Sequence, residues 1–523
     1  MDPISWIIAG VTKVVNIVTG RQRLKQEERF HRESMAVETR KAAALERIAE
    51  YLDGLPEAVP KIRNPFLEGR KLEGEYKYRE AIQRYEACFQ QETTASQRAA
   101  LHILIGSCFY DLSELAEAEG HYREAETAAK EAGDKEGLAA ALGNIGVIYH
   151  HKGELDKALD CLQQALKGES ELGRKEGEAM QLGNIGLIYQ TRGELDTAID
   201  YFQQALDINT EIGRREGEAN QLNNIGLIYH TRGELDTAID YFQQALNINR
   251  EIARKRGEAM QLGNIGATYA DKGDLHKALD YHQQALNIDR KIGNRQGQAS
   301  DLGNIGLIYQ IRGELDKALD YHQQSLKLHR EIGRKEGEAD QLGNIGNIYL
   351  TRGDLDKTLD YHEQALSIDR QVGNREGEAS DLGNIGLIYH TRGELDKALD
   401  YHNQALEIER RMARKHGEAS DLGNIGNIYA AKGELDRALE LYEQVVKIER
   451  EIGRRWGEAN ALSNMGTVYA DKGEPDKALE HLEQSLKIFE EIGAKMEVEQ
   501  TKRIIERIKE SMEKTRGQES GNV

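Results

Sequence analysis

Residues 177–216 read GEAMQLGNIGLIYQTRGELDTAIDYFQQALDINTEIGRRE, and this stretch decides the fold. Residues 217–256 repeat it with changes at only eight of forty positions. The text returns nine times without a gap between residues 137 and 496, and a glycine opens every copy. A fixed period near 40 residues is typical of a repeat protein, in which stacked supersecondary units form one long surface.

Each copy predicts two helices. In the copy from Gly177, the first set of apolar residues recurs at steps of three or four, as on one face of a helix. Gly193 then supplies a turn, and a second apolar set with the same steps runs from Leu195 to Ile212. Gly213 stands where a helix would end in a left-handed cap. A helix pair this small cannot bury its apolar face alone, so successive pairs must stack.

The spacing of Leu182, Ile185, Gly186 and Tyr189, followed by Ala198, Phe202 and Ala205, resembles the tetratricopeptide repeat. The unit has 40 residues instead of 34, and the usual terminal proline is missing. The run LGNIGxIY…RGELDxAxDYxxQAL…EIGR is most similar to the repeats of the Partner-of-Inscuteable adaptors, and more loosely to kinesin light chains. The resemblance covers about residues 97–496. It implies an all-α, right-handed superhelical solenoid of about eleven helix pairs.

The rest of the chain divides into shorter parts. Prolines at 56, 60 and 65 mark a boundary before the array. After the array, apolar residues follow one side of a Lys/Glu-rich helix, as expected of a solubilising cap. The predicted parts are an N-terminal helical segment (1–53), a Pro-containing linker (54–64), degenerate repeats (65–136), nine regular repeats (137–496), a C-terminal capping helix (497–514) and a disordered tail (515–523).

Composition limits the function classes. The net charge of −20 opposes nucleic acid as the main partner. Three cysteines and no secretory signal predict a cytoplasmic protein. No apolar run reaches 18 residues, which argues against a membrane-spanning helix.

The first helix of each copy has a second face that avoids charge. In the copy from Gly177 this face holds Met180, Asn184, Leu187 and Thr191, and in the nine copies only three of its 36 positions are charged, all of them aspartate. A face without charge is usually covered or is a binding surface. Its central position is Asn in every copy, and Asn can pair with the backbone amides of another chain.

The resemblance implies that this face lines a concave groove that binds a protein or peptide segment. Equally open is a structural interpretation, in which the asparagines hydrogen-bond between neighbouring copies. The predicted groove residues are Asn184, Leu187, Asn224, Leu227, Asn264, Asn304, Leu307, Asn344, Asn347, Asn384, Leu387 and Asn424.

No metal, cofactor or catalytic site is predicted. His282, His322, His362 and His402 replace Phe202 and Phe242 in four successive copies, and one imidazole per copy converges poorly on one ion. We therefore expect these histidines in the core or at its edge. The glycines recur with the period and form no phosphate-binding loop. No nucleophile, base and orienting group stand out from the repeat, so the chain is predicted not to be an enzyme.

The N-terminus carries an apolar stripe at helical spacing. A basic stretch from Arg21 to Arg32 follows it, interrupted by Glu27 and Glu28. The stripe has three interpretations: a cap on the solenoid, a contact with another chain, or an interfacial helix on an acidic membrane. Its residues are Ile4, Trp6, Ile7, Ile8, Val11, Val14, Val15 and Val18.

The sequence therefore favours a non-enzymatic scaffold or adaptor with a protein or peptide partner in its groove and no nucleic-acid partner. Two alternatives stay open. One is a structural protein that self-assembles into an oligomer or filament. The other is a membrane-associated effector that uses the N-terminal helix, in which case the cytoplasmic protein is peripheral to a membrane.

Overall fold

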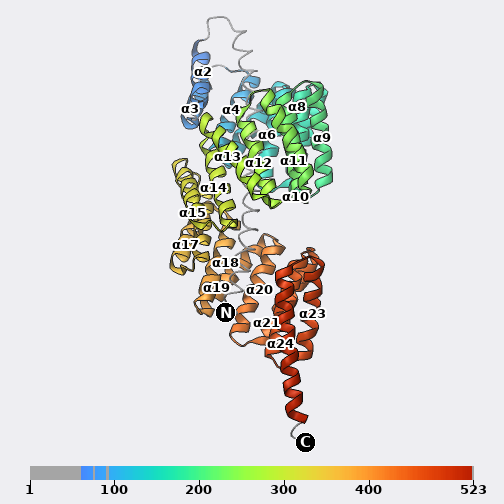
Figure 1. Ribbon diagram of the computed structural model, residues 1–523. Helices are drawn as coiled ribbons and strands as arrows, with labels where there is room; N and C mark the ends of the chain where they lie inside the picture. The colour runs from blue at the N-terminus through green and yellow to red at the C-terminus, as the bar shows by residue number, and fades with distance from the viewer. Residues whose placement is uncertain (1–59, 75–76, 90–92, 113, 521–523) are drawn as a thin grey trace. The chain divides into compact units, whose positions relative to one another are not determined.

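The structure is a computed structural model that describes residues 60–520, apart from residues 75–76, 90–92 and 113. Over these residues it contains 23 α-helices and no β-strand (Figure 1). Eleven helix pairs precede the last helix. The all-α solenoid of stacked pairs is thus confirmed, and the predicted right-handed path stays a prediction. The predicted N-terminal segment, with its apolar stripe, lies outside the described residues.

The described helices belong to two compact units, residues 60–304 and 305–520, and the boundary falls inside α14 (Arg295–Ile311). The pairs of the earlier unit are α2 (Pro60–Gly74) with α3 (Tyr78–Cys88), α4 (Ala95–Asp111) with α5 (Leu115–Ala132), α6 (Lys135–His151) with α7 (Leu155–Glu171), α8 (Lys175–Arg192) with α9 (Leu195–Glu211), α10 (Arg215–Arg232) with α11 (Leu235–Glu251), and α12 (Lys255–Asp271) with α13 (Leu275–Ile292). The later unit continues with α15 (Leu315–Glu331), α16 (Lys335–Thr351) with α17 (Leu355–Val372), α18 (Arg375–Thr391) with α19 (Leu395–Arg411), α20 (Lys415–Ala431) with α21 (Leu435–Glu451), α22 (Arg455–Asp471) with α23 (Pro475–Glu491), and α24 (Lys495–Ser520).

Helix ends differ from the predicted parts at both sides of the array. Helix α2 begins at Pro60, inside the predicted linker 54–64, because proline is tolerated in the first turn of a helix. Helix α24 runs to Ser520, so most of the predicted tail 515–523 is helical. The tail is rich in Glu, Lys, Arg and Gln, which favour helix. No helix in the described part of the chain is long and apolar enough to cross a bilayer.

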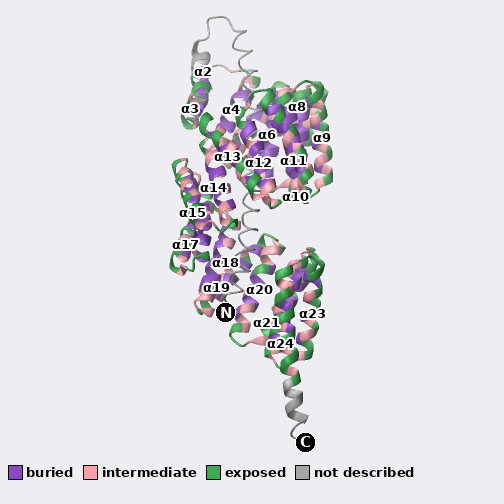
Figure 2. Cartoon of the chain, viewed as in Figure 1, coloured by how far each residue is buried: buried purple, intermediate pink, exposed green. Residues whose placement is uncertain are grey.

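Within each unit, a second helix packs both against the first helix of its own copy and against the first helix of the next. In the copy from Gly177, Ile185, Ala198 and Phe202 are completely buried. Gly186 faces the Phe202 ring, and a Cβ there would lie only 2.6 Å from a ring carbon. The glycine therefore lets the two helices approach closely around an aromatic core. Figure 2 shows buried residues along such contacts and exposed residues on the outer surfaces.

The turn after each second helix needs a left-handed residue. Gly213 has φ +69°, as expected of a helix-ending glycine. In two copies the equivalent residue is alanine, and Ala253 and Ala413 adopt φ +56° and +53°. A left-handed conformation costs a residue with a Cβ about 1 kcal/mol. The packing of these two copies therefore holds the turn against a local strain.

A buried polar side chain closes each junction between copies. Asn209, at the end of α9, is 1% exposed and lies against Gly217 in the first turn of α10. Asn249 meets Gly257 in the same way, and a Cβ on either glycine would overlap the asparagine. These contacts explain why a glycine opens these copies: its missing side chain makes room for the polar group of the preceding helix.

Candidate functional site

The predicted groove residues all lie on first helices. The first helices of successive copies contact one another directly, as for α6 and α8, or α16 and α18. We call the surface formed by Met180, Asn184, Leu187 and Thr191, and by the equivalent residues of other copies, the first-helix face. It brings together predicted residues from different copies within each unit.

The centre of the first-helix face is more covered than predicted. Six of the predicted residues are buried and six are half-buried, because neighbouring first helices pack side by side. The buried residues are Asn184, Leu227, Asn344, Asn347, Asn384 and Leu387, and the half-buried ones are Leu187, Asn224, Asn264, Asn304, Leu307 and Asn424. A partner would reach the centre of this face only in part.

The central asparagines differ in their contacts. Asn264 Nδ2 donates to Asn223 Oδ1 of the preceding copy at 2.8 Å, and Asn464 Nδ2 donates to Asn427 Oδ1 at 3.4 Å. Asn184 is 5% exposed, and its Nδ2 has no hydrogen-bond partner among the described residues. It lines a cavity of about 10 Å³, close to the space of one water molecule. Both interpretations therefore keep support: some asparagines link copies, and Asn184 keeps a free donor.

The helix ends of the same face are its open part. Thr191, Thr231 and Ile311 are exposed, and Ile311 is 52% accessible. Polar pairs link successive copies here: His150 Nε2 lies 2.8 Å from Thr191 Oγ1, and the equivalent His230 Nε2 lies 3.0 Å from Asp271 Oδ2. These ends, and not the asparagine column, offer a partner its most accessible contacts.

The four successive histidines are buried, as expected. Each is at most 1% exposed and meets a polar side chain of the next copy through Nδ1. The pairs are His282–Asp301 (3.1 Å), His322–Gln341 (2.9 Å), His362–Asp381 (2.9 Å) and His402–Asp421 (3.1 Å). Burial raises the pKa of Asp301 and Asp421, and the histidine bond lowers it. Within the described ranges no three His, Cys, Asp or Glu side chains are placed to hold a metal ion.

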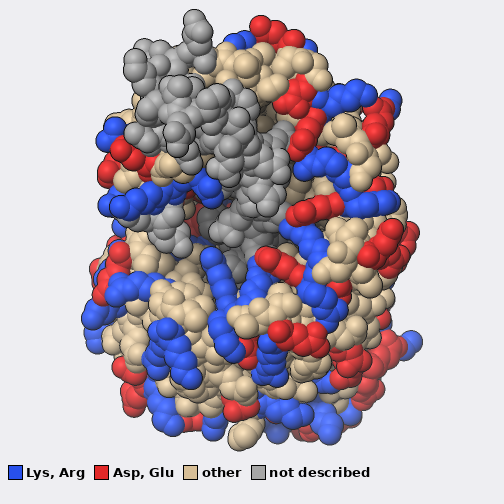
Figure 3. Space-filling view, turned by 90° about the horizontal axis from the view of Figure 1, so that it is seen from above, with Lys and Arg blue, Asp and Glu red and all other residues tan. Residues whose placement is uncertain are grey.

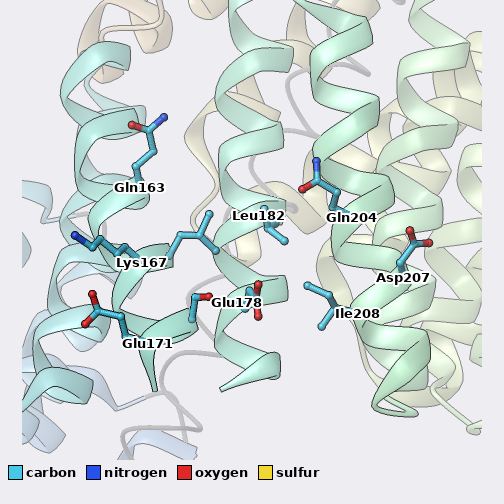
Figure 4. A pocket seen from close by; sticks show the side chains of 10 residues that line it. Gln163, Lys167, Glu171, Glu178, Leu182, Gln204, Asp207 and Ile208 are labelled. Carbon is cyan, nitrogen blue, oxygen red and sulfur yellow. The ribbon is translucent and has the colours of Figure 1, made fainter. Parts of the chain in front are cut away.

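A surface that the sequence analysis missed lies between second helices. An open cavity of about 680 Å³ separates α7 from α9, with α8 as its floor (Figure 4). Leu166, Leu182 and Ile208 form its apolar part, and Gln163, Lys167 and Gln204 stand on its walls. An equivalent cavity of about 380 Å³ separates α15 from α17. We call this recurring feature the second-helix groove. Its one sequence signal is an outward Gln in every regular copy, from Gln164 to Gln484.

Charge is mixed over the surface. In the view of Figure 3, basic and acidic side chains alternate, and no large area of one sign appears among the coloured residues. Many of these charges pair between copies, such as Arg352 with Asp316 at 2.5 Å and Lys432 with Asp396 at 2.7 Å. The carboxylates of both pairs are more than 90% exposed, and such pairs stabilise a fold by at most about 1 kcal/mol each.

Comparison with known proteins places the array. A family described as the tetratricopeptide repeat matches residues 97–168, 178–251, 258–331, 339–411 and 418–491, which is more than half of the chain. Among curated proteins nothing matches.

Three solved structures illustrate the shared fold. The chain is similar to a signal transduction ATPase with numerous domains from Pyrococcus horikoshii, which has a tetratricopeptide repeat sensor (16% identity, 81% of this chain and 67% of that one, TM-score 0.50). It is also similar to aspartyl phosphate phosphatase F from Bacillus subtilis (15%, 69% and 95%, TM-score 0.47) and to yeast Tom70 (14%, 86% and 96%, TM-score 0.43). At such identities the likeness concerns the fold alone.

Proposed function

Because the chain belongs to the tetratricopeptide repeat family, we propose that it is a non-enzymatic scaffold or adaptor that binds a protein or peptide segment along its first-helix face. Repeat arrays of this kind present an extended surface on which a partner chain can lie. The resemblance to the Partner-of-Inscuteable adaptors supports the same role. Cys88, Cys108 and Cys161 are buried free thiols, which agrees with the proposed cytoplasmic location.

One observation carries the proposal: the first-helix face avoids charge in a chain of which 31% of residues are charged. Only Asp271, Asp340 and Asp471 are charged among its 36 positions in the regular copies. An exposed surface with no partner has no reason to exclude charge. Asparagine and threonine amides and hydroxyls supply donors and acceptors for a peptide backbone, and exposed residues such as Ile311 supply apolar contact.

The test places charge on the open end of this face. Asp already occupies the Thr191 position in two other copies, as Asp271 and Asp471, so Thr191→Asp and Thr231→Asp should preserve the fold. Peptides selected from a random library on the full chain serve as probes. We expect the double variant to bind these peptides at least about tenfold more weakly, since an unpaired charge in a contact costs more than 1 kcal/mol.

The matched control carries the same charge on the other side of the array. Gln163→Asp and Gln203→Asp lie on exposed parts of α7 and α9. Circular dichroism confirms that both proteins keep their helices. If the control variant loses the peptides as strongly as the threonine variant, or if no peptide is selected at all, the first-helix face is not the binding surface.

A further inference from the structure

The outer surface of the second helices carries a repeated charge order. In four successive second helices of the later unit, α15, α17, α19 and α21, an acid stands in the first third of the helix and an arginine ten residues later, and all eight side chains are exposed. The acids are Asp320, Asp360, Asp400 and Glu440, and the arginines are Arg330, Arg370, Arg410 and Arg450. Each of these helices is thus acidic near one end and basic near the other.

The arginines keep free hydrogen-bonding capacity. Arg370 uses Nε to reach Glu378 at 2.9 Å, and Arg410 uses Nε to reach Glu418 at 2.9 Å. Their side chains are still 49% and 50% exposed. A guanidinium has five N–H donors, so each one can bind a second carboxylate.

The acids are equally available. Asp360 and Asp400 each accept one hydrogen bond, at 2.9 Å, from the glutamine one turn later. An ionised carboxylate has about four acceptor sites, so most of each is free.

The second-helix groove gives these charges a place to meet a partner. Between α15 and α17 it has an apolar floor that includes Leu326 and Ile345, and Arg330 stands in its wall. Grooves and ridges on this surface have the same spacing, since both come from the same 40-residue period. A surface with this spacing packs ridges into grooves most simply against another surface of equal spacing.

We propose that the partner of this outer surface is a second copy of this chain, related by a twofold axis. A twofold rotation reverses the direction of the helices, so the acidic end of each ridge meets the basic end of its neighbours in the other copy. The two ends are ten residues apart, or about 15 Å along a helix. Asp360 of one copy then reaches Arg330 or Arg370 of the other, and the same contacts form twice, as in an isologous dimer.

The middle of the ridge fits the same rotation. Position 443 then lies opposite position 447, which pairs Glu443 with Lys447 across the axis. Gln323 lies opposite Lys327 in the same way, and both stand on the groove wall. With the helices parallel, equal charges would face each other, which is destabilising. The charge order therefore selects the antiparallel arrangement.

The test measures the mass of the full chain by sedimentation equilibrium over a range of concentrations. We expect the wild-type chain to reach twice its monomer mass of 58.8 kDa. Arg370→Glu with Arg410→Glu makes both ends acidic, and Asp360→Arg with Asp400→Arg makes both ends basic. Each double variant alone should stay at the monomer mass, and an equal mixture of the two should recover the dimer.

Lys357→Glu with Lys397→Glu serves as control, because it changes the charge equally at exposed residues near the start of α17 and α19. It should dimerise like the wild type. A wild-type chain that stays monomeric overturns the proposal. So does a dimer that persists in both double variants, as an association through another surface would, and so does a mixture that fails to recover the dimer although both variants keep their helicity.

Discussion

At the end of α13, Asp289 shows how much one junction residue can control. Its side chain is 3% exposed, and Oδ1 accepts a hydrogen bond of 2.9 Å from Asn294 Nδ2. Burial raises the pKa of Asp289 to about 7, and nearby Asp301 raises it further, although the Asn294 bond and Arg256 lower it. Burial raises the pKa of Glu409, at the equivalent position, to about 7 as well.

This pKa predicts a pH-dependent stability. A raised carboxyl pKa means that the fold prefers the protonated form, so the free energy of unfolding falls as pH rises from about 4, the unfolded value, to about 7. Asn209 and Asn249 fill the same position in other copies. We therefore expect Asp289→Asn to stabilise the protein by about 1–2 kcal/mol at about pH 8 and hardly at all near pH 5, measured by urea unfolding.

The reverse exchange is the control. Asn249→Asp should lower stability at the higher pH and leave it nearly unchanged at the lower one. A difference between Asp289→Asn and the wild-type chain that is the same at both pH values would show that the carboxyl does not titrate between them.

The same position marks a limit of sequence reasoning at this scale. Periodicity predicted the buried apolar residues, because Ile185 and Phe202 fall on an apolar stripe. It did not predict that Asn209 and Asp289 would be buried, since they look like surface residues at the end of a helix. Their burial depends on Gly217 and Gly297, which begin the next copy and make room for them.

Helices of successive copies are matched by pairs of buried side chains. Phe202 lies 19 residues before Gln221, and Phe242 lies 19 residues before Gln261. At the same spacing, His282, His362 and His402 hydrogen-bond to aspartates (list: Asp301, Asp381 and Asp421). An aromatic hydrocarbon is thus followed by an amide, and an imidazole is followed by a carboxylate in three junctions of four.

This matching predicts a coupling between two residues. His362→Phe should fit the space, because Phe202 packs against the equivalent glycine, but it leaves the completely buried Asp381 without its imidazole. We expect a loss of about 2–4 kcal/mol. His362→Phe with Asp381→Gln recreates the pairing of Phe202 and Gln221 and should recover at least about 1 kcal/mol of it. Thermal unfolding of both variants and of Asp381→Gln alone completes the cycle, and strictly additive effects would contradict the matching.

Surface accessibility at this scale could be predicted only in part. The spacing of Asn184, Leu187 and Thr191 placed them correctly on one face of α8. Their exposure depends on how closely α8 approaches α6, which the period of one helix does not contain. The second-helix groove was missed for the same reason: its walls, such as Gln163 and Gln204, come from helices one full copy apart.

For the whole array, stability should depend on which copy is removed. Each copy contacts only its neighbours, so removing one whole copy preserves the stacking. Deleting residues 217–256 places Phe202 against Gln261, a pairing that other junctions already use. Deleting residues 257–296 places Phe242 against Asp301, a carboxylate without its imidazole. We expect the second deletion to be less stable by about 2–4 kcal/mol, as for a buried unpaired charge.

Both deletions remove the same length and keep the register, so chain length itself is controlled. The comparison uses urea unfolding of the two shortened chains and of the intact chain. Equal stability of the two shortened chains would show that any copy can follow any other.

Matched junctions also bear on how such an array changes over generations. A gene with nine nearly identical segments recombines with itself and gains or loses segments readily. Inside the Phe–Gln group or inside the His–Asp group, a recombinant chain keeps compatible neighbours and folds. Across the border between the groups, near residues 242 to 301, an exchange creates a mispaired junction that selection removes. The side chains buried between helices thus act as a filter on the gene, and they decide where the protein can grow longer.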